Sequence, residues 1–337
     1  KSMTLKCIAG IVQPDSGTIT INGQTVFDSK RKINLPPQKR HTGFLFQQYA
    51  LFPTMTVREN MEIVLCRLKK TERKQRVEEM LEKFHLCDVS NQKPSQLSGG
   101  QQQRAAMARM LVSSPEIIML DEPFSALDSF LRLAVETELM EILSSFNGTI
   151  LLVSHNRDEI YRICQRMLIL QKGNMAAWGT TEELFRNPGT LAAARLTGIK
   201  NIAPALAFDV RKIYVPEWGL VLETEQDVPD EIVANNAVTN KTVTNGTFYV
   251  AIRAHHIREA LPGETVNCFD FNVKRKQSEP FRTQEILTVA TEKEQTIVPL
   301  IRFISGGQDL IFPSQETRVV RRLCLPPSHL LLLKNDP

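Results

Sequence analysis

The chain has 337 residues, of which 42% are hydrophobic and 23% are charged. This composition is that of an ordinary folded protein, and the length allows roughly two domains of ~100–200 residues each. The formal net charge is only +4, which excludes a strong overall basic field of the kind that binds nucleic acid. A basic cluster at Lys30–Lys32 and Lys39-Arg40 is local, and we interpret it as a solvated loop.

Cysteine usage and hydropathy indicate a reduced protein without membrane spans. No CxxC pair occurs, which argues against a zinc site and against a disulfide framework, so we expect reduced thiols of the cytosol. The longest apolar runs, Leu330–Leu333 and Ile150–Val153, are shorter than the ~18 residues that cross a bilayer, and we recognise no signal peptide. The six cysteines are Cys7, Cys66, Cys87, Cys164, Cys268 and Cys324.

The first third of the chain predicts a helix, a hairpin and a strand. The chain opens on Lys1-Ser2 and an apolar helical pattern that ends at Gly10. Because it starts inside an element and without Met, we expect residues before Lys1 in the native protein. Thr18–Ile21 and Thr25–Phe27 flank Asn22-Gly23, which suits a type I′ turn. A short strand is expected at 43–46, and a charged, helical insertion at about 56–87.

The middle of the chain alternates helices and buried strands. Ser98 is placed to cap a helix that reaches about residue 113. Glu116–Asp121 is an apolar run that ends in a carboxylate, as expected of a strand buried on both faces of a parallel sheet. A second such run, Thr149–Val153, ends at Ser154-His155. With helices expected at 129–146 and 157–164 and a strand at 167–171, the pattern predicts an α/β fold.

After about residue 199 the pattern changes to short β-rich segments separated by Pro, Gly and Asn. This pattern predicts a small all-β domain. The segments are Phe248–Arg253, Glu285–Ala290, Thr296–Phe303 and Val319–Leu325.

Several polar residues follow predicted strands directly. Asp121-Glu122, His155 and Gln47 each stand at the carboxyl end of such a strand, and ligands of open parallel sheets lie outside those ends. Ser98–Gln101 adds a Gly-Gly pair at a helix start, where backbone N–H groups and the helix dipole favour a phosphate. We therefore expect the strand ends to converge on one ligand site. Each feature alone also fits a plain structural role: a capped helix, a capping carboxylate pair or a surface histidine.

Leu97–Arg104 reads LSGGQQQR, and with this stretch the sequence closely resembles the ABC ATPase family, whose signature motif it is. The resemblance is strong over residues 1–200. It implies that Lys1-Ser2 is the end of a P-loop, G-x-x-x-x-G-K-[ST], in which Lys1 reaches the β- and γ-phosphates and Ser2 binds Mg²⁺. The loop glycines and the aromatic residue that stacks on adenine would precede Lys1, so we expect the chain as given to bind ATP poorly.

The resemblance also assigns roles to the other polar residues. Asp121 would hold Mg²⁺, usually through water, and Glu122 would be the general base that polarises the attacking water. His155 would contact the γ-phosphate, and Asp128 in Ser125–Asp128 would touch the opposite subunit. Gln47, rather than the neighbouring Gln48, would sense Mg²⁺ and the γ-phosphate. The predicted site residues are Glu122 and His155 for catalysis; Lys1, Ser2, Gln47, Ser98, Gly99, Gly100, Gln101, Asp121 and Asp128 for ATP; and Ser2, Gln47 and Asp121 for Mg²⁺.

In this family two subunits pack head to tail, and each ATP lies between the P-loop of one and the signature of the other. Such a two-fold interface repeats the site twice. The resemblance thus implies a homodimer at the cytoplasmic face of the membrane, bound to an integral permease. An extracytoplasmic solute-binding protein would act indirectly, and no nucleic acid is expected.

The expected fold is a P-loop NTPase core at 1–200 with a helical insertion at about 55–115, its first strand and P-loop glycines missing. An oligobinding-like regulatory domain follows at 201–337.

Asp158-Glu159 and Gly179–Phe185 resemble importer ATPases, and residues 184–202 look most like molybdate or sulfate importers. The expected cargo is therefore molybdate or a related oxyanion, sulfate or tungstate. Ferric iron, a polyamine or a sugar, a non-transport ABC protein and a regulator with vestigial catalysis remain alternatives. His255-His256 suggests a metal site only weakly, because no third ligand is placed by sequence.

Overall fold

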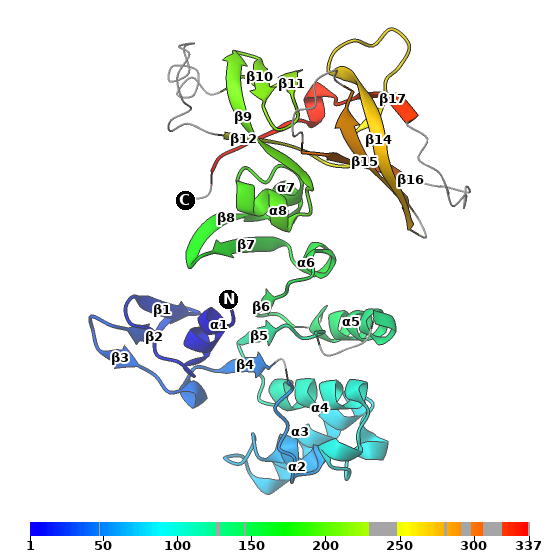
Figure 1. Ribbon diagram of the computed structural model, residues 1–337. Helices are drawn as coiled ribbons and strands as arrows, with labels where there is room; N and C mark the ends of the chain where they lie inside the picture. Colours follow the sequence, from blue (N-terminus) through cyan, green and yellow to red (C-terminus); the bar gives the residue numbers. More distant parts are fainter. Residues whose placement is uncertain are drawn as a thin grey trace. The chain divides into compact units, whose positions relative to one another are not determined.

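The computed structural model describes residues 1–46, 48–125, 129–144, 146–228, 248–279, 282–290, 298–305 and 319–335. The chain divides into two compact units, Lys1–Cys164 and Gln165–Pro337 (Figure 1). The predicted domain boundary near residue 200 stays a prediction. Within the described ranges, no helix is both long and apolar enough to cross a membrane.

The first unit begins with the predicted helix and hairpin. Helix α1, Ser2–Ala9, ends at Gly10, whose φ of 78° is left-handed, as in a standard C-cap. Strands β1, Thr18–Ile21, and β2, Gln24–Asp28, pair antiparallel, and β3, Ile33–Asn34, extends the sheet. The turn residues Asn22 and Gly23 have φ of 47° and 82°, as a type I′ turn requires.

A parallel sheet of β4, Thr42–Leu45, β5, Ile117–Asp121, and β6, Thr149–Val153, lies at the centre of the first unit, in the order β4-β5-β6. Every residue of β5 is buried, as its continuous apolar run predicts. Asp121 pairs in register with Val153, so the residues that follow β5 and β6 leave the sheet at the same edge. Helix α1 packs against this sheet through a cluster that includes Leu5 and Met119.

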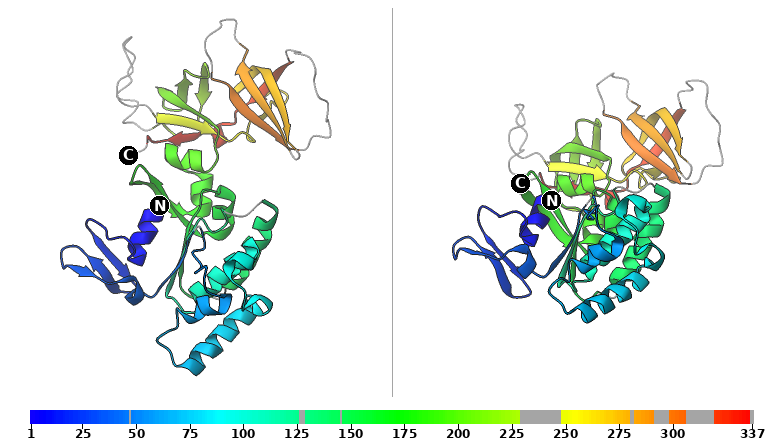
Figure 2. Two further views of the ribbon diagram at one scale, coloured as in Figure 1. Left: turned by 60° about the horizontal axis from the view of Figure 1, so that its bottom comes forward. Right: turned by 90° about the horizontal axis from the view of Figure 1, so that it is seen from below.

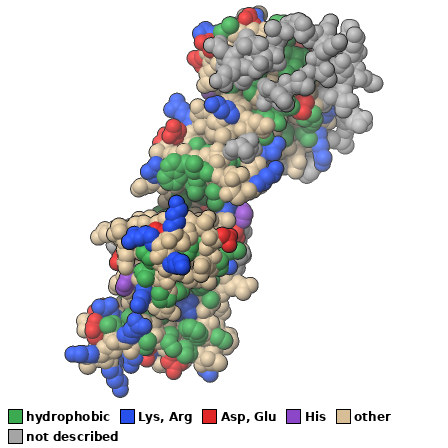
Figure 3. Space-filling view, turned by 90° about the vertical axis from the view of Figure 1, so that its left-hand side faces the viewer, with side chains coloured by type: hydrophobic (Ala, Val, Ile, Leu, Met, Phe, Trp, Pro, Cys, Tyr) green, Lys and Arg blue, Asp and Glu red, His purple; other side chains and the backbone are tan. Residues whose placement is uncertain are grey.

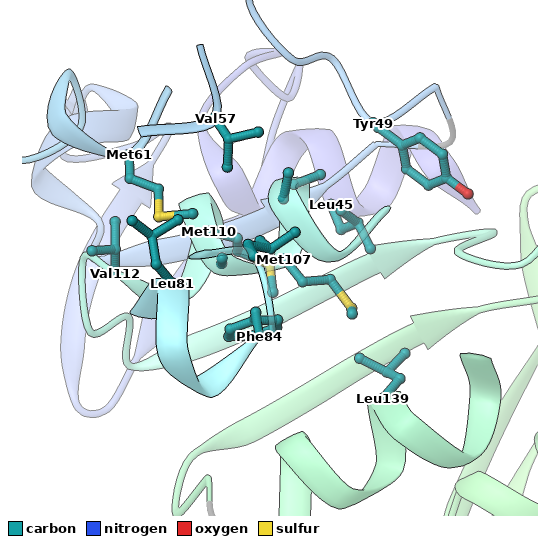
Figure 4. Close-up of a cluster of buried hydrophobic side chains, with 14 of the residues drawn as sticks. Leu45, Tyr49, Val57, Met61, Leu81, Phe84, Met107, Met110, Val112 and Leu139 are labelled. Atoms are coloured by element: carbon teal, nitrogen blue, oxygen red, sulfur yellow. The ribbon is translucent and has the colours of Figure 1, made fainter. Parts of the chain in front are cut away.

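The helices that follow α1 in the first unit share one hydrophobic core. The core joins side chains far apart in sequence, including Met61, Phe84, Met107 and Leu139 (Figure 4). Each fully buried side chain of this size contributes roughly 1.5–3 kcal/mol. In both views of Figure 2, the cyan helices α2 to α4 lie apart from the dark-blue α1. The helices are α2 Val57–Glu62, α3 Lys70–Lys83, α4 Gly99–Leu111, α5 Ser129–Ser144 and α6 Arg157–Ile163.

The second unit opens with a hairpin and continues through two short helices, and the rest of its described residues form mainly strands. In the part of the chain that the structure describes, two five-stranded sheets run in the orders β11-β10-β9-β12-β18 and β13-β17-β14-β15-β16, and a core that includes Trp218 and Phe271 joins them. The elements are β7 Arg166–Gln171, β8 Asn174–Thr180, α7 Thr181–Arg186, α8 Leu191–Leu196, β9 Asn201–Asp209, β10 Lys212–Val215, β11 Leu220–Glu223, β12 Phe248–Ile252, β13 Arg258–Glu259, β14 Cys268–Glu279, β15 Arg282–Val289, β16 Leu300–Ser305, β17 Val319–Cys324 and β18 Leu331–Leu333.

The predicted fold class, an α/β core with a helical subdomain followed by a β-rich part, is confirmed. The predicted strand at Phe248–Arg253 is β12, and that at Val319–Leu325 is β17. The strand predicted at Thr296–Phe303 begins later, at Leu300, and residues 291–297 lie outside the described ranges. On the face drawn in Figure 3, Lys and Arg side chains lie in several separate groups, which agrees with the small net charge.

Candidate active site

Ser2 and Asp121 meet although 119 residues separate them in sequence. Ser2 Oγ donates a hydrogen bond of 2.7 Å to Asp121 Oδ1. Ser2 is the first residue of α1 and Asp121 the last of β5, so packing of this helix on the sheet brings the two oxygens together. Hydroxyl and carboxylate oxygens are the hard ligands that Mg²⁺ prefers. This pair of oxygens therefore fits a magnesium site, and the exposed Lys1 adjoins it.

Glu122 occupies an unusual backbone conformation directly after β5. Its φ is 49°, in the left-handed region that non-glycine residues seldom adopt. The turn is fixed at both ends. Glu122 N–H donates to the Val153 carbonyl at 2.9 Å, and the Glu122 carbonyl accepts from Ser125 N–H at 3.2 Å and Ser125 Oγ at 2.9 Å. Strained residues of this kind cluster at functional sites, and these hydrogen bonds hold the Glu122 backbone in its conformation.

The Glu122 carboxylate is paired with His155. His155 Nε2 lies 2.8 Å from Glu122 Oε1, and the His155 side chain is 71% exposed while that of Glu122 is 19% exposed. The imidazole therefore covers the carboxylate from the solvent side. Because most of the imidazole stays exposed, it can also reach a ligand that enters from solvent.

The loop that carries His155 is anchored by a buried carboxylate that the sequence did not single out for this role. Ser154 Oγ donates to Glu159 Oε2 at 2.6 Å, and Asn156 N–H donates to Ser154 Oγ at 2.9 Å. Asn156 then caps α6 by accepting from Asp158 N–H at 2.9 Å. These bonds fix the backbone on both sides of His155.

The signature residues begin α4 as predicted. Ser98 and Gln101 form a reciprocal capping box: Gln101 N–H donates to Ser98 Oγ at 3.3 Å, and Ser98 N–H donates to Gln101 Oε1 at 2.9 Å. A Cβ added at Gly99 or Gly100 would meet no atom within 4 Å. Each glycine costs a helix about 1 kcal/mol relative to alanine, and the packing of this chain does not require either one.

The structure does not unite the signature with the other site residues. Across the described residues, no hydrogen bond or ion pair joins Ser98–Gln101 to Ser2, Asp121, Glu122 or His155. Gln47 and Asp128 lie outside the described residues. Gln48, the alternative to Gln47, is exposed.

Gln103 links α4 to the edge of the sheet that carries Glu122, a role that the sequence did not indicate. This side chain is fully buried. Its Nε2 donates to the Pro123 carbonyl at 3.2 Å, and its Oε1 accepts from Tyr49 Oη at 3.3 Å. Burial raises the pKa of Tyr49, so the phenol remains a donor. The third glutamine of LSGGQQQR thus connects the signature helix with the residue after Glu122, a contact that only the folded chain reveals.

Comparisons with known proteins agree with these motifs. Residues 1–125 match the family described as ABC transporter. The molybdenum import ATP-binding protein ModC of Paramagnetospirillum magneticum is 36% identical over 56% of this chain and 52% of that protein. The spermidine/putrescine import ATP-binding protein PotA of Bacillus cereus is 37% identical over 60% of this chain and 61% of that protein. The chain thus spans only about half to three-fifths of the length of these two relatives.

Another relative is matched over more of its length. The spermidine/putrescine import ATP-binding protein PotA of Oleidesulfovibrio alaskensis is 37% identical over 80% of this chain and 79% of that protein. A solved dimeric ATP-binding cassette in a post-hydrolysis state, bound to ADP and Pi, is 30% identical over 53% of this chain and 80% of that chain, with a TM-score of 0.45. Because it matches the Oleidesulfovibrio relative over most of that protein and the family over residues 1–125, the chain belongs to the ATP-binding subunits of ABC transporters, of the importer type.

Proposed function

We propose that this chain is the ATP-hydrolysing, energy-coupling subunit of an ABC importer. The observation that carries the proposal is the set of paired contacts at one sheet edge, Ser2 with Asp121 and Glu122 with His155. Ser2 and Asp121 offer oxygen ligands for a metal, and Glu122 offers a carboxylate base with the His155 imidazole as its partner. Family membership makes ATP the substrate that we propose.

In the proposed reaction, water attacks the γ-phosphorus of ATP, and the bond from that phosphorus to the bridging oxygen of ADP breaks. Lys1 would hold the β- and γ-phosphates. Ser2, Asp121 and Gln47 would hold Mg²⁺, which supplies positive charge to the phosphate oxygens when bound. Glu122 would accept the proton of the attacking water, a contribution of ~10²–10⁴-fold. His155 would orient the Glu122 carboxylate and reach the γ-phosphate with its exposed face.

We propose that the complete site needs two copies of the chain. Gly99 and Gly100 begin the helix and are unobstructed, and no described residue of the same unit accepts a hydrogen bond from their N–H groups. A phosphate held by the P-loop of a second copy would occupy this surface, because helix N-termini attract anions. Asp128 is proposed to contact that second copy. ATP would then hold a two-fold dimer together, and hydrolysis would release it.

The dimer is tested with the full-length protein by light scattering after chromatography. Glu122→Gln should form a dimer when ATP and Mg²⁺ are present and a monomer when they are absent. Adding Ser98→Glu should abolish that dimer, since a carboxylate would meet the γ-phosphate. The control is Glu116→Gln, the same change at another glutamate, which accepts a hydrogen bond of 2.8 Å from Asn22 Nδ2. We expect this variant to stay monomeric. A dimer that forms without nucleotide, or that survives Ser98→Glu, would contradict the proposed arrangement.

The membrane partner is proposed to be an integral permease, with the ATPase bound at its cytoplasmic face. The relatives named for molybdenum and for spermidine/putrescine import support a role of this class. A cargo-specific solute-binding protein would deliver solute to the permease from the other side. The chain should therefore co-purify with a permease from solubilised membranes, whereas co-purification with ribosomes or DNA alone would contradict the importer proposal.

Molybdate or a related oxyanion is the cargo that we propose from residues 184–202. A polyamine is the second candidate, because the relative matched over 79% of its length is named for spermidine/putrescine import. Cells that lack the gene can be supplied with the wild-type or the Glu122→Gln protein, and uptake of labelled molybdate and spermidine measured. The cargo whose uptake returns only with the wild-type protein is the transported one. Restoration of spermidine alone would overturn the oxyanion assignment.

A further inference from the structure

Two cysteines and a glutamate converge in the second unit, far from the nucleotide-site residues in sequence. Cys268 is the first residue of β14 and Cys324 the last of β17, and the two are directly opposite in register. Leu325 N–H donates to the Asn267 carbonyl at 3.0 Å, so the cysteine pair is of the non-hydrogen-bonded type. Side chains of such pairs lie closest together, with Cα atoms about 4.5 Å apart.

The third member is Glu264, from the loop that precedes β14. One ligand atom from each of Glu264, Cys268 and Cys324 lies within 4.8 Å of the other two. Cys324 Sγ is 3.3 Å from Glu264 Oε1. A tetrahedral zinc site with Zn–S of about 2.3 Å and Zn–O of about 2.1 Å has S···O separations of about 3.6 Å and S···S of about 3.8 Å. The three atoms are thus close to the spacing that one small cation imposes.

The Glu264 carboxylate is held in place by other groups. Arg258 donates to it twice, Nη2 to Oε1 at 2.7 Å and Nη1 to Oε2 at 2.8 Å, and Leu261 N–H donates to Oε2 at 2.9 Å. These three hydrogen bonds orient the carboxylate, as the outer hydrogen-bond partners of a metal ligand do.

We propose that Glu264, Cys268 and Cys324 form a binding site for a thiophilic divalent cation such as Zn²⁺. Sulfur ligands select Zn²⁺ or a similarly soft cation over Mg²⁺, which separates this site from the nucleotide site. Two thiolates, one carboxylate and the Arg258 guanidinium carry a net charge of −2, which a divalent cation neutralises. Both cysteine residues are buried, and burial of charge is tolerated when it is balanced in this way.

The groups around the three ligands also indicate what supplies the fourth ligand of the cation. The Val266 carbonyl lies 3.4 Å from Cys268 Sγ and 3.6 Å from Cys324 Sγ, and the Glu264 side chain is 25% exposed. A water reaching the cation past Glu264, or the Val266 carbonyl itself, would complete four ligands. In the segments that the structure describes, this is the only such convergence of three ligand side chains, and His255, His256 and His329 form stacked and edge-on ring contacts instead.

The test uses the 337-residue chain, purified under reducing conditions and stripped of metal with a chelator. Titration with Co²⁺ should give one equivalent of bound ion with a thiolate-to-cobalt charge-transfer absorption, and Zn²⁺ should displace it. Cys268→Ser and Cys324→Ser should each lose this absorption. Cys66→Ser and Cys87→Ser, at exposed cysteines, should retain it. Circular dichroism of each variant shows whether it has folded.

X-ray absorption at the zinc edge provides a test without any substitution. The zinc-loaded wild-type chain should show two sulfur ligands, with oxygen completing the shell. Fewer than two sulfur ligands, or unchanged Co²⁺ absorption in both folded serine variants at Cys268 and Cys324, would overturn the proposal. The readouts do not involve ATP, so their failure leaves the importer proposal unaffected.

Discussion

His155 Nε2 lies 2.8 Å from Glu122 Oε1, so the two polar residues that follow adjacent parallel strands are in direct contact. The contact exists because β5 and β6 run in register and end together. In a free subunit it keeps the proposed base paired and oriented. Under the proposed function, the exposed imidazole would touch both Glu122 and a γ-phosphate that enters from solvent.

Glu122→Gln should lower ATP turnover in the full-length protein by ~10²–10⁴-fold, because the amide cannot accept the proton of the attacking water. Nucleotide affinity should remain, since the amide keeps the size of the side chain. Steady-state phosphate release and equilibrium nucleotide binding measure the two effects separately. Glu116→Gln, the same change just before the other end of β5, should leave turnover within about twofold of wild type. Normal turnover in Glu122→Gln would remove this residue from its proposed role.

Ser2→Ala should raise the Mg²⁺ concentration needed for half-maximal hydrolysis, because it removes the hydroxyl that lies 2.7 Å from Asp121 Oδ1. A lost hydrogen bond to a charged group corresponds to about 1.5–3 kcal/mol, or roughly 10–150-fold. Ser2→Thr keeps the hydroxyl and is the matched control. Hydrolysis measured across a Mg²⁺ titration checks the prediction, and identical midpoints for the alanine and threonine variants would contradict it.

Gly100→Ala should stabilise the helix by up to about 1 kcal/mol and still depress ATP hydrolysis. The added Cβ meets no atom within 4 Å in this chain, but it would occupy the surface proposed for the phosphate of a second copy. Gly148→Ala is the contrasting control, because its Cβ would lie 2.5 Å from the Glu116 carbonyl oxygen and should cost about 1–3 kcal/mol of stability. Thermal unfolding and phosphate release are measured on both. Full activity in Gly100→Ala would count against a ligand at this helix terminus.

Gln103→Ala should destabilise the first unit, because it leaves the Tyr49 hydroxyl and the Pro123 carbonyl without their buried partner. An unsatisfied buried polar group costs about 1–3 kcal/mol. Urea unfolding gives the change in free energy. Gln75→Ala, at an exposed position of α3, should have an effect near zero because alanine favours helix. Equal unfolding midpoints for the two variants would show that the Gln103 contacts are not stabilising.

Local chemistry in the sequence determined the elements and the nature of the site. Asn22-Gly23 specified a tight hairpin because both residues tolerate positive φ. Glu116–Asp121 specified a doubly buried strand because its apolar run lacks alternation. Ser98 specified a helix start because its hydroxyl accepts a backbone N–H. The motif Leu97–Arg104 then indicated the family, and the family supplied roles for residues whose individual patterns were ambiguous.

Only the tertiary structure decided which distant residues touch. Strand register placed Glu122 against His155, and helix packing placed Ser2 against Asp121 and Gln103 against Pro123. The same applies to Cys268 and Cys324, whose lack of a CxxC spacing argued against a zinc site and whose strands nevertheless pair directly. Sequence spacing reports contacts within a helix or a turn. It carries no information on the register between strands separated by a long stretch of chain, because packing of the whole core selects that register.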